Sequence, residues 1–155
     1  MLRFSSIVLL FATTITATLA LDEGTYRICQ ADRVALPLCL TSPESGDAIK
    51  MLPLDPANPI PQLWYVIALD SDTFTFEQRE TSCMAAKTVS GLLACAAEST
   101  PFSLIRGEFN TYYVDTVETD YNFAQKRMTH LPDSEYVVFS PPAPIPANRF
   151  TFERF

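Results

Sequence analysis

The sequence repeats itself three times, which limits the chain to folds built from three equivalent units. Each unit opens with a threonine, an aromatic residue, a variable residue and an apolar residue, at 25–28, 73–76 and 111–114. Each unit closes with a polar residue two positions before an aromatic residue, at 62–64, 100–102 and 148–150. The closing aromatic residue follows the opening threonine by 39 residues in the first and third units and by 29 in the second. The first and third units therefore align without a gap.

The middle unit has lost about ten residues, most of them from a proline-rich linker that the other units keep at 53–61 and 141–146. Within the units, β-branched and aromatic segments are separated by Pro, Ser, Asp or Gly. They predict strands at 25–30, 38–41, 49–54, 63–68, 73–78, 82–86, 92–96, 102–106, 112–117, 122–126, 136–140 and 149–153. The Ala-rich segment 82–97 could mimic a helix, but the break at Ser90-Gly91 favours two strands.

Four strands in each of three units, about 24–69, 70–108 and 109–155, predict an all-β barrel with three-fold pseudo-symmetry. Closing the units around one axis buries a common core and leaves no exposed sheet edge. Residues 1–20 have the pattern of a secretory signal peptide, with Arg3, a short apolar run and small residues up to Ala20. We therefore expect a secreted, extracellular protein whose single mature domain covers 21–155.

The charge balance disfavours several classes of partner. The formal net charge is −7, and it becomes −8 when residues 1–20, with their single arginine, are removed. An acidic chain is a poor match for nucleic acid or for an anionic membrane, which attract Lys and Arg. The only histidine, His130, precedes Leu131-Pro132 and is predicted to lie in a surface turn. No Gly-x-Ser-x-Gly or His-Glu-x-x-His motif occurs, so we expect no enzyme, cofactor or metal site, although the many carboxylates leave a glycosidase pair open.

The four cysteines predict two disulfides, because an even number in a secreted chain is typical of a disulfide framework. Three pairings are possible. The sequential pairing, Cys29 with Cys39 and Cys83 with Cys95, keeps each bond inside one repeat and is the one we expect. A zinc site is disfavoured, because separations of 10 and 12 residues match no Cys-x-x-Cys ligand pair.

Three units of about 40 residues with a degenerate Gln-x-Trp closing triplet resemble the β-trefoil fold. The opening 24–28 and the ending 141–152 are similar to the small β-trefoil serine-protease inhibitors of mushrooms, in the ricin-B-like superfamily. The same fold carries ricin-type lectins and the mushroom cysteine-protease inhibitors. The resemblance implies a fungal origin, but the signal peptide and the four cysteines depart from the inhibitor pattern.

The resemblance implies a protein that blocks a trypsin-like serine protease through an exposed loop. Such a loop must be rigid and must present Lys or Arg to the carboxylate in the protease pocket. Two loops inside the predicted disulfides qualify, one with Arg33 and Val34 and the other with Lys87 and Thr88. Solvated turns often carry such charges without any function.

Two further functions stay open, and the mature chain is expected to be a monomer in each case. A ricin-type lectin pairs an Asp with an aromatic platform and an Asn or Gln. The third repeat offers such groups, and Gln62 could serve in the first; the candidates are Asp115, Asp120, Tyr121 and Asn122. Trp64 and Phe150 are expected in the core rather than as sugar platforms. The other alternative is a secreted effector that binds a host protein through its acidic surface.

Overall fold

The computed structural model describes residues 21–32, 36–43, 48–118, 124–143 and 145–155. The predicted signal peptide, residues 1–20, lies outside them. Twelve strands form one sheet. They are β1 (Gly24–Gln30), β2 (Leu38–Thr41), β3 (Lys50–Pro53), β4 (Leu63–Ala68), β5 (Thr73–Gln78), β6 (Cys83–Lys87), β7 (Leu93–Ala96), β8 (Phe102–Arg106), β9 (Thr111–Thr116), β10 (Arg127–His130), β11 (Val137–Ser140) and β12 (Phe150–Arg154).

The helical content of the described residues is two single 3-10 turns, η1 (Ile60–Gln62) and η2 (Pro146–Asn148). No helix in this part of the chain is long and apolar enough to cross a membrane. The Ala-rich segment folds as the hairpin β6–β7, as predicted. The prediction of an all-β chain with four strands in each of three repeats is confirmed.

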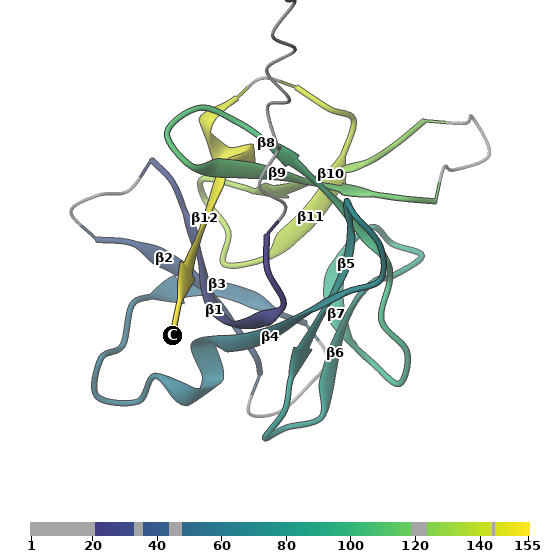
Figure 1. The fold of residues 1–155 in the computed structure, drawn as a ribbon. Coiled ribbons are helices and arrows are strands. Elements are labelled where there is room, and N and C mark those ends of the chain that lie inside the picture. The colour runs from purple at the N-terminus through teal and green to yellow at the C-terminus, as the bar shows by residue number, and fades with distance from the viewer. Residues whose placement is uncertain (1–20, 33–35, 44–47, 119–123, 144) are drawn as a thin grey trace, which may run out of the picture.

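Six of the strands close into a barrel. Around the ring, β1 pairs with β4, β4 with β5, β5 with β8, β8 with β9, β9 with β12, and β12 with β1. The other six strands form the hairpins β2–β3, β6–β7 and β10–β11, which Figure 1 shows in separate sectors around the centre. Backbone hydrogen bonds between hairpins join them: Ile49 N–H donates to Leu93 O (3.0 Å) and Phe139 N–H to Gly91 O (2.7 Å).

The repeated sequence markers meet each other on neighbouring strands of the barrel. The opening aromatic residue of each repeat pairs with the closing aromatic residue of the same repeat: Tyr26 with Trp64, Phe74 with Phe102, and Tyr112 with Phe150. All three closing aromatic residues are fully buried, so the prediction that Trp64 and Phe150 belong to the core is confirmed. The indole Nε1–H of Trp64 donates to Leu40 O at 2.8 Å, which satisfies its one polar group.

Both predicted disulfides are present. Cys29 and Cys39 are direct neighbours in the β1–β2 pair, with 4.0 Å between their Cα atoms. Cys83 and Cys95 join β6 to β7 with 4.8 Å between their Cα atoms. Each bond therefore links strands within one repeat, as the sequential pairing requires. The described residues contain no free cysteine.

The prediction was wrong for the tenth strand. It was expected at 122–126, but residues 124–126 are not in a strand and β10 begins at Arg127. The connection before β10 is longer than its counterpart in the first repeat, and the turn after it is shorter. The two differences in length nearly cancel. The 39 residues between the opening threonine and the closing aromatic residue are therefore kept, although β10 lies later in its repeat than β2 does in the first.

This shift also corrects the expectation for His130. The residue ends β10, pairs with Val137 and is only 2% exposed, so it is not in a surface turn. Its Nε2–H donates to the Ser134 carbonyl at 2.7 Å, and its Nδ1 lies 2.9 Å from Oε1 of Gln30. Gln30 is 100 residues away in sequence, so no local pattern could have indicated this contact.

The turn between β8 and β9 holds a bulky residue in a left-handed conformation. Phe109 has φ 53° and Asn110 has φ 58°, and the N–H of Thr111 donates to Glu108 O at 3.1 Å. The Phe109 side chain is 89% exposed, so packing does not offset the steric cost of this conformation.

Replacing Phe109 with Asn is expected to stabilise the protein by about 1 kcal/mol, because Asn tolerates left-handed backbone better than Phe does. The midpoint temperature of thermal unfolding should then rise by about 3 °C. The control is Val89→Asn at another exposed turn, since Val89 is not among the residues with positive φ. A gain in both variants, or in neither, would contradict the role assigned to the left-handed conformation.

Candidate functional site

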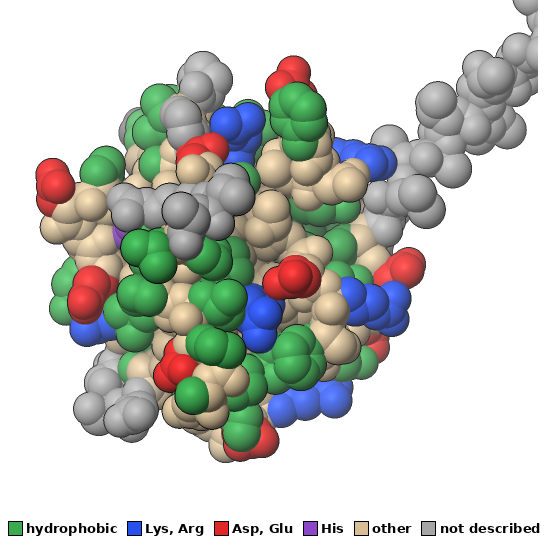
Figure 2. Space-filling model, turned by 90° about the vertical axis from the view of Figure 1, so that its left-hand side faces the viewer, with side chains coloured by type: hydrophobic (Ala, Val, Ile, Leu, Met, Phe, Trp, Pro, Cys, Tyr) green, Lys and Arg blue, Asp and Glu red, His purple; other side chains and the backbone are tan. Residues whose placement is uncertain are grey.

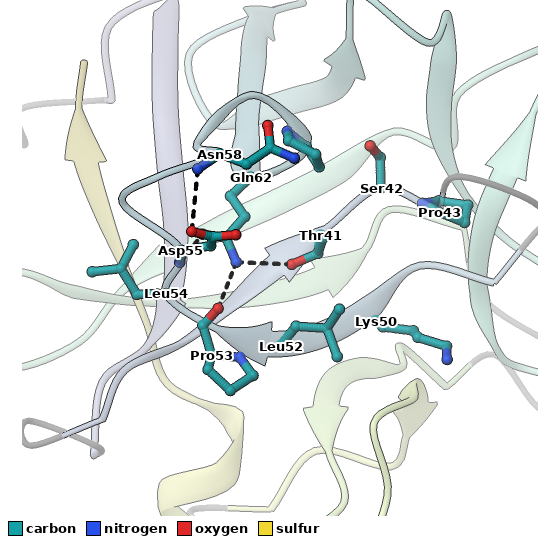
Figure 3. Close-up of a pocket in the computed structure, with 11 residues that line it drawn as sticks. Thr41, Ser42, Pro43, Lys50, Leu52, Pro53, Leu54, Asp55, Asn58 and Gln62 are labelled. Atoms are coloured by element: carbon teal, nitrogen blue, oxygen red, sulfur yellow. Dashed lines mark hydrogen bonds between the residues drawn. The ribbon is translucent and has the colours of Figure 1, made fainter.

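A cavity of about 600 Å³ opens beside the hairpin of the first repeat (Figure 3). It lies between the end of β2, the outer side of β3 and the proline-rich segment that leads to β4. Its lining residues are Thr41, Ser42, Pro43, Lys50, Leu52, Pro53, Leu54, Asp55, Asn58, Pro61 and Gln62. This set combines apolar aliphatic and proline surface with a few groups that form hydrogen bonds.

Gln62, the first residue of the closing triplet, builds the inner wall of the cavity. Its side chain is nearly fully buried, and its Nε2 donates to Pro53 O (2.9 Å) and to Thr41 Oγ1 (3.2 Å). Its Oε1 accepts the backbone N–H of Asp55 at 3.0 Å. Figure 3 shows these bonds joining β2, the end of β3 and the proline-rich segment. The interpretation of Gln62 as a sugar ligand therefore competes with a structural role that already uses both ends of its amide.

Asp55 shapes the outer wall. Its Oδ1 accepts the backbone N–H groups of Ala57 (2.9 Å) and Asn58 (3.1 Å), which fixes a tight turn. The prolines of 53–61 restrict the backbone further, because each fixes its own φ. The middle repeat connects β7 to β8 by 97–101 only, so it has no counterpart to this wall.

The one lysine of the cavity is already paired. Lys50 Nζ lies 2.9 Å from Oε2 of Glu135, which comes from the third repeat. It also lies 5.5 Å from the ring centroid of Tyr136. The hydrogen bond to Glu135 raises the pKa of Lys50, so the ammonium stays charged at neutral pH. The cavity is thus bounded by an ion pair rather than by a lone cation.

A second cavity of about 280 Å³ lies beyond β3, where the first repeat meets the third. It shares Leu52 and Pro53 with the first cavity. Its remaining lining residues are Leu38, Met51, His130, Pro132, Asp133, Ser134 and Glu135. The hydrogen bonds of His130 to Ser134 and Gln30 hold its ring in place at this wall.

The predicted inhibitor residues Lys87 and Thr88 lie at the tip of the β6–β7 hairpin. Lys87 is the last residue of β6 and pairs with Leu93. Thr88 Oγ1 accepts the N–H of Leu92 at 3.0 Å, and the N–H of Gly91 donates to Thr88 O at 3.0 Å. The tip is therefore a tight, fixed turn. Arg33 and Val34, the other candidates, lie outside the described residues.

The predicted sugar ligand Asp115 is buried and fully engaged. Its two carboxylate oxygens accept from Nε (2.7 Å) and from a terminal nitrogen (2.9 Å) of Arg127. The guanidinium also stacks 4.2 Å from the ring centroid of Tyr113, and the bond to Asp115 raises the pKa of Arg127. The structure places Asp115 1% exposed, away from any ligand in solution. Asp120, Tyr121 and Asn122 lie outside the described residues.

Sequence reasoning did not select the residues that line the first cavity. Lys50, Leu52, Asp55 and Asn58 match no ligand motif; the first two fell in the predicted strand 49–54 and the last two in the proline-rich linker 53–61. One signal was available: the proline-rich linker is present in the first repeat and absent from the second. Among the residues that the structure describes, no group of three or more His, Cys, Asp or Glu side chains is placed to hold a metal ion.

The sequence matches no protein-family model and no curated protein. Several solved structures share its architecture. A ricin B-like lectin from Macrolepiota procera, solved in complex with lactose, has a TM-score of 0.69 and 15% identity, with 87% of this chain and 99% of that one covered. The Rhizoctonia solani agglutinin has a TM-score of 0.67 and 10% identity, with 90% of this chain and 100% of that one covered.

The designed three-fold symmetric protein ThreeFoil matches with a TM-score of 0.63 and 10% identity, over 85% of this chain and 99% of that one. The chain has the β-trefoil fold. At these identities the likeness shows the fold alone. By their descriptions, the Macrolepiota procera protein is a ricin B-like lectin and the Rhizoctonia solani protein is an agglutinin.

Replacing Asp115 with Ala is expected to cost about 3 kcal/mol of stability, because it leaves the largely buried guanidinium of Arg127 without its carboxylate. Denaturant unfolding measures the change. Asp22→Ala is the control, since Asp22 pairs with Arg154 at an exposed site and should contribute less than about 0.5 kcal/mol. Equal effects of the two substitutions would contradict a structural role for Asp115.

Proposed function

We propose that the chain is a secreted carbohydrate-binding protein of the lectin type and that the cavity of the first repeat holds the sugar. The observation that carries the proposal is the composition of this cavity: apolar Leu52, Leu54 and proline surface beside Asp55 and Asn58. A sugar presents C–H faces and hydroxyl groups, so a site for it needs both kinds of surface. The lactose-bound lectin with the same fold adds support.

The polar groups of the cavity have capacity left for a ligand. Asp55 uses Oδ1 for the turn, while its Oδ2 accepts none of the hydrogen bonds within the described chain. The side-chain amide of Asn58 is exposed and likewise makes none there. A carboxylate oxygen and an amide can accept from and donate to neighbouring sugar hydroxyls. Leu52 and Leu54 offer the apolar face against which a pyranose ring would lie.

The first repeat is favoured over the third for a physical reason. Asp115 is held by Arg127 and is buried, so it cannot bond to a sugar without breaking a bidentate ion pair. Asp120, Tyr121 and Asn122 stay a prediction for a second site. The two disulfides and the pattern of residues 1–20 support the proposal of a secreted mature domain that covers 21–155.

The test is a glycan array with residues 21–155, followed by calorimetry on the neutral glycans that bind. Asn58→Ala should weaken binding about tenfold, because one ligand hydrogen bond is lost. Gln125→Ala, which removes an exposed amide in the third repeat, should leave binding unchanged. The proposal fails if no glycan binds, or if the two substitutions have the same effect.

Protease inhibition through the β6–β7 tip is the second candidate. The observation in its favour is rigidity: the Cys83–Cys95 bond and the hydrogen bonds of Thr88 fix a convex turn next to a basic residue. A rigid loop loses little entropy on binding a protease. The tightness of the turn weighs against it, since Lys87 is held in a strand pair with Leu93.

If this second candidate is right, the purified protein inhibits trypsin and Lys87→Ala weakens inhibition at least 100-fold, because the charge that meets the pocket carboxylate is lost. A trypsin assay with a small chromogenic substrate measures the inhibition constant. Arg106→Ala, at the exposed start of another turn, is the control and should not change it. An absence of inhibition by the unmodified protein would remove this candidate and would leave the lectin proposal untouched.

A further inference from the structure

We infer that the ligand is an uncharged oligosaccharide that lies across β3 and occupies both cavities at once. This inference rests on the proposed function and specifies the length and charge of the sugar. It is carried by two observations: the two cavities share a wall, and a single ion pair lies on the border between them.

The shared wall is formed by Leu52 and Pro53, which line the 600 Å³ cavity on one side and the 280 Å³ cavity on the other. Figure 2 views the side of the molecule that carries β2 and β3 in Figure 1, and it shows hydrophobic side chains gathered there with single charged groups between them. Together the cavities have the size of a typical ligand site. A sugar unit in the first cavity therefore has room for a linked unit in the second.

The second cavity offers its own polar contacts. Asp133 is exposed, and its carboxylate accepts none of the hydrogen bonds within the described chain. Ser134 Oγ accepts the N–H of Tyr136 at 3.0 Å, which leaves its O–H able to donate. His130 is fixed by its bonds to Ser134 O and Gln30, so this side of the cavity is preorganised.

The charge of the combined site excludes acidic sugars. Lys50 lines the first cavity and Glu135 the second, and their 2.9 Å bond joins the two. Lys50 is the one lysine or arginine among the described lining residues, whereas Asp55, Asp133 and Glu135 are acidic. A sialic acid or uronic acid would meet the carboxylates of Asp55 and Asp133, while the charges of Lys50 and Glu135 offset each other within their ion pair. An uncharged saccharide meets no such repulsion.

The length of the ligand is tested by calorimetry on residues 21–155. The probes are the neutral tetrasaccharide that binds best on the array and its terminal disaccharide. The tetrasaccharide should bind at least tenfold more tightly. Asp133→Ala should remove this gain and leave the disaccharide affinity unchanged, while the control Asp72→Ala, at an exposed turn elsewhere, should change neither. Equal affinities for the two probes in the unmodified protein would overturn the two-cavity site.

The charge selection is tested with a sialylated form of the same glycan. The unmodified protein should bind it at least tenfold more weakly than the neutral form. Glu135→Gln removes the carboxylate that pairs with Lys50, so the ratio of the affinities for the neutral and sialylated glycans should fall at least threefold. The variant should fold, because both side chains are substantially exposed and such pairs contribute little to stability. Equal binding of neutral and sialylated glycans, or an unchanged difference in Glu135→Gln, would overturn the assignment.

The two levels of the proposal fail in different ways. If no glycan of any kind binds, the proposed function itself is wrong. If glycans bind and Asn58→Ala weakens them, but chain length and charge make no difference, the sugar site of the first repeat stands and only this inference is lost.

Discussion

The fold depends on one contact that is made three times: the aromatic residue that opens each repeat pairs across strands with the aromatic residue that closes it. These pairs place Trp64, Phe102 and Phe150 in one buried core. Within this core Phe102 stacks on two further rings. The ring centroids of Phe76 and Phe102 are 5.2 Å apart, and those of Phe102 and Phe139 are 5.6 Å apart. No single repeat could bury its apolar face alone, so closing the barrel and forming the core are one event.

Because the core is shared by all three repeats, differences between the repeats are concentrated in the connections. The first repeat keeps a proline-rich segment that Gln62 ties to β2 and to the end of β3. The middle repeat has lost that segment, because only residues 97–101 connect β7 to β8. The first cavity is therefore a property of one repeat. It is built around Gln62, the first residue of the closing triplet, which is a different polar residue in the other two repeats.

Two ion pairs illustrate how burial decides what a charge does. Asp115 and Arg127 are inside the protein and bonded at two points, which makes them part of the structure. Lys50 and Glu135 lie at the surface between two cavities, where the pair adds little stability but sets the local charge. Only their surroundings separate the structural role of the buried pair from the role in ligand selection that we propose for the exposed pair.

The sequence by itself determined the features that follow from short-range patterns: the three-fold repetition, eleven of the strands to within a residue or two, and the burial of Trp64 and Phe150. It favoured the sequential disulfide pairing among three possible ones, and the structure decided it. It did not determine β10, because an insertion and a shortening cancelled in the spacing, nor the burial of His130 against Gln30, 100 residues away. The second cavity was also out of reach, because it lies where the first repeat meets the third and Lys50 meets Glu135 there across 85 residues. Such contacts exist only once the barrel has closed, and closure brings together side chains whose local sequence carries no sign of one another.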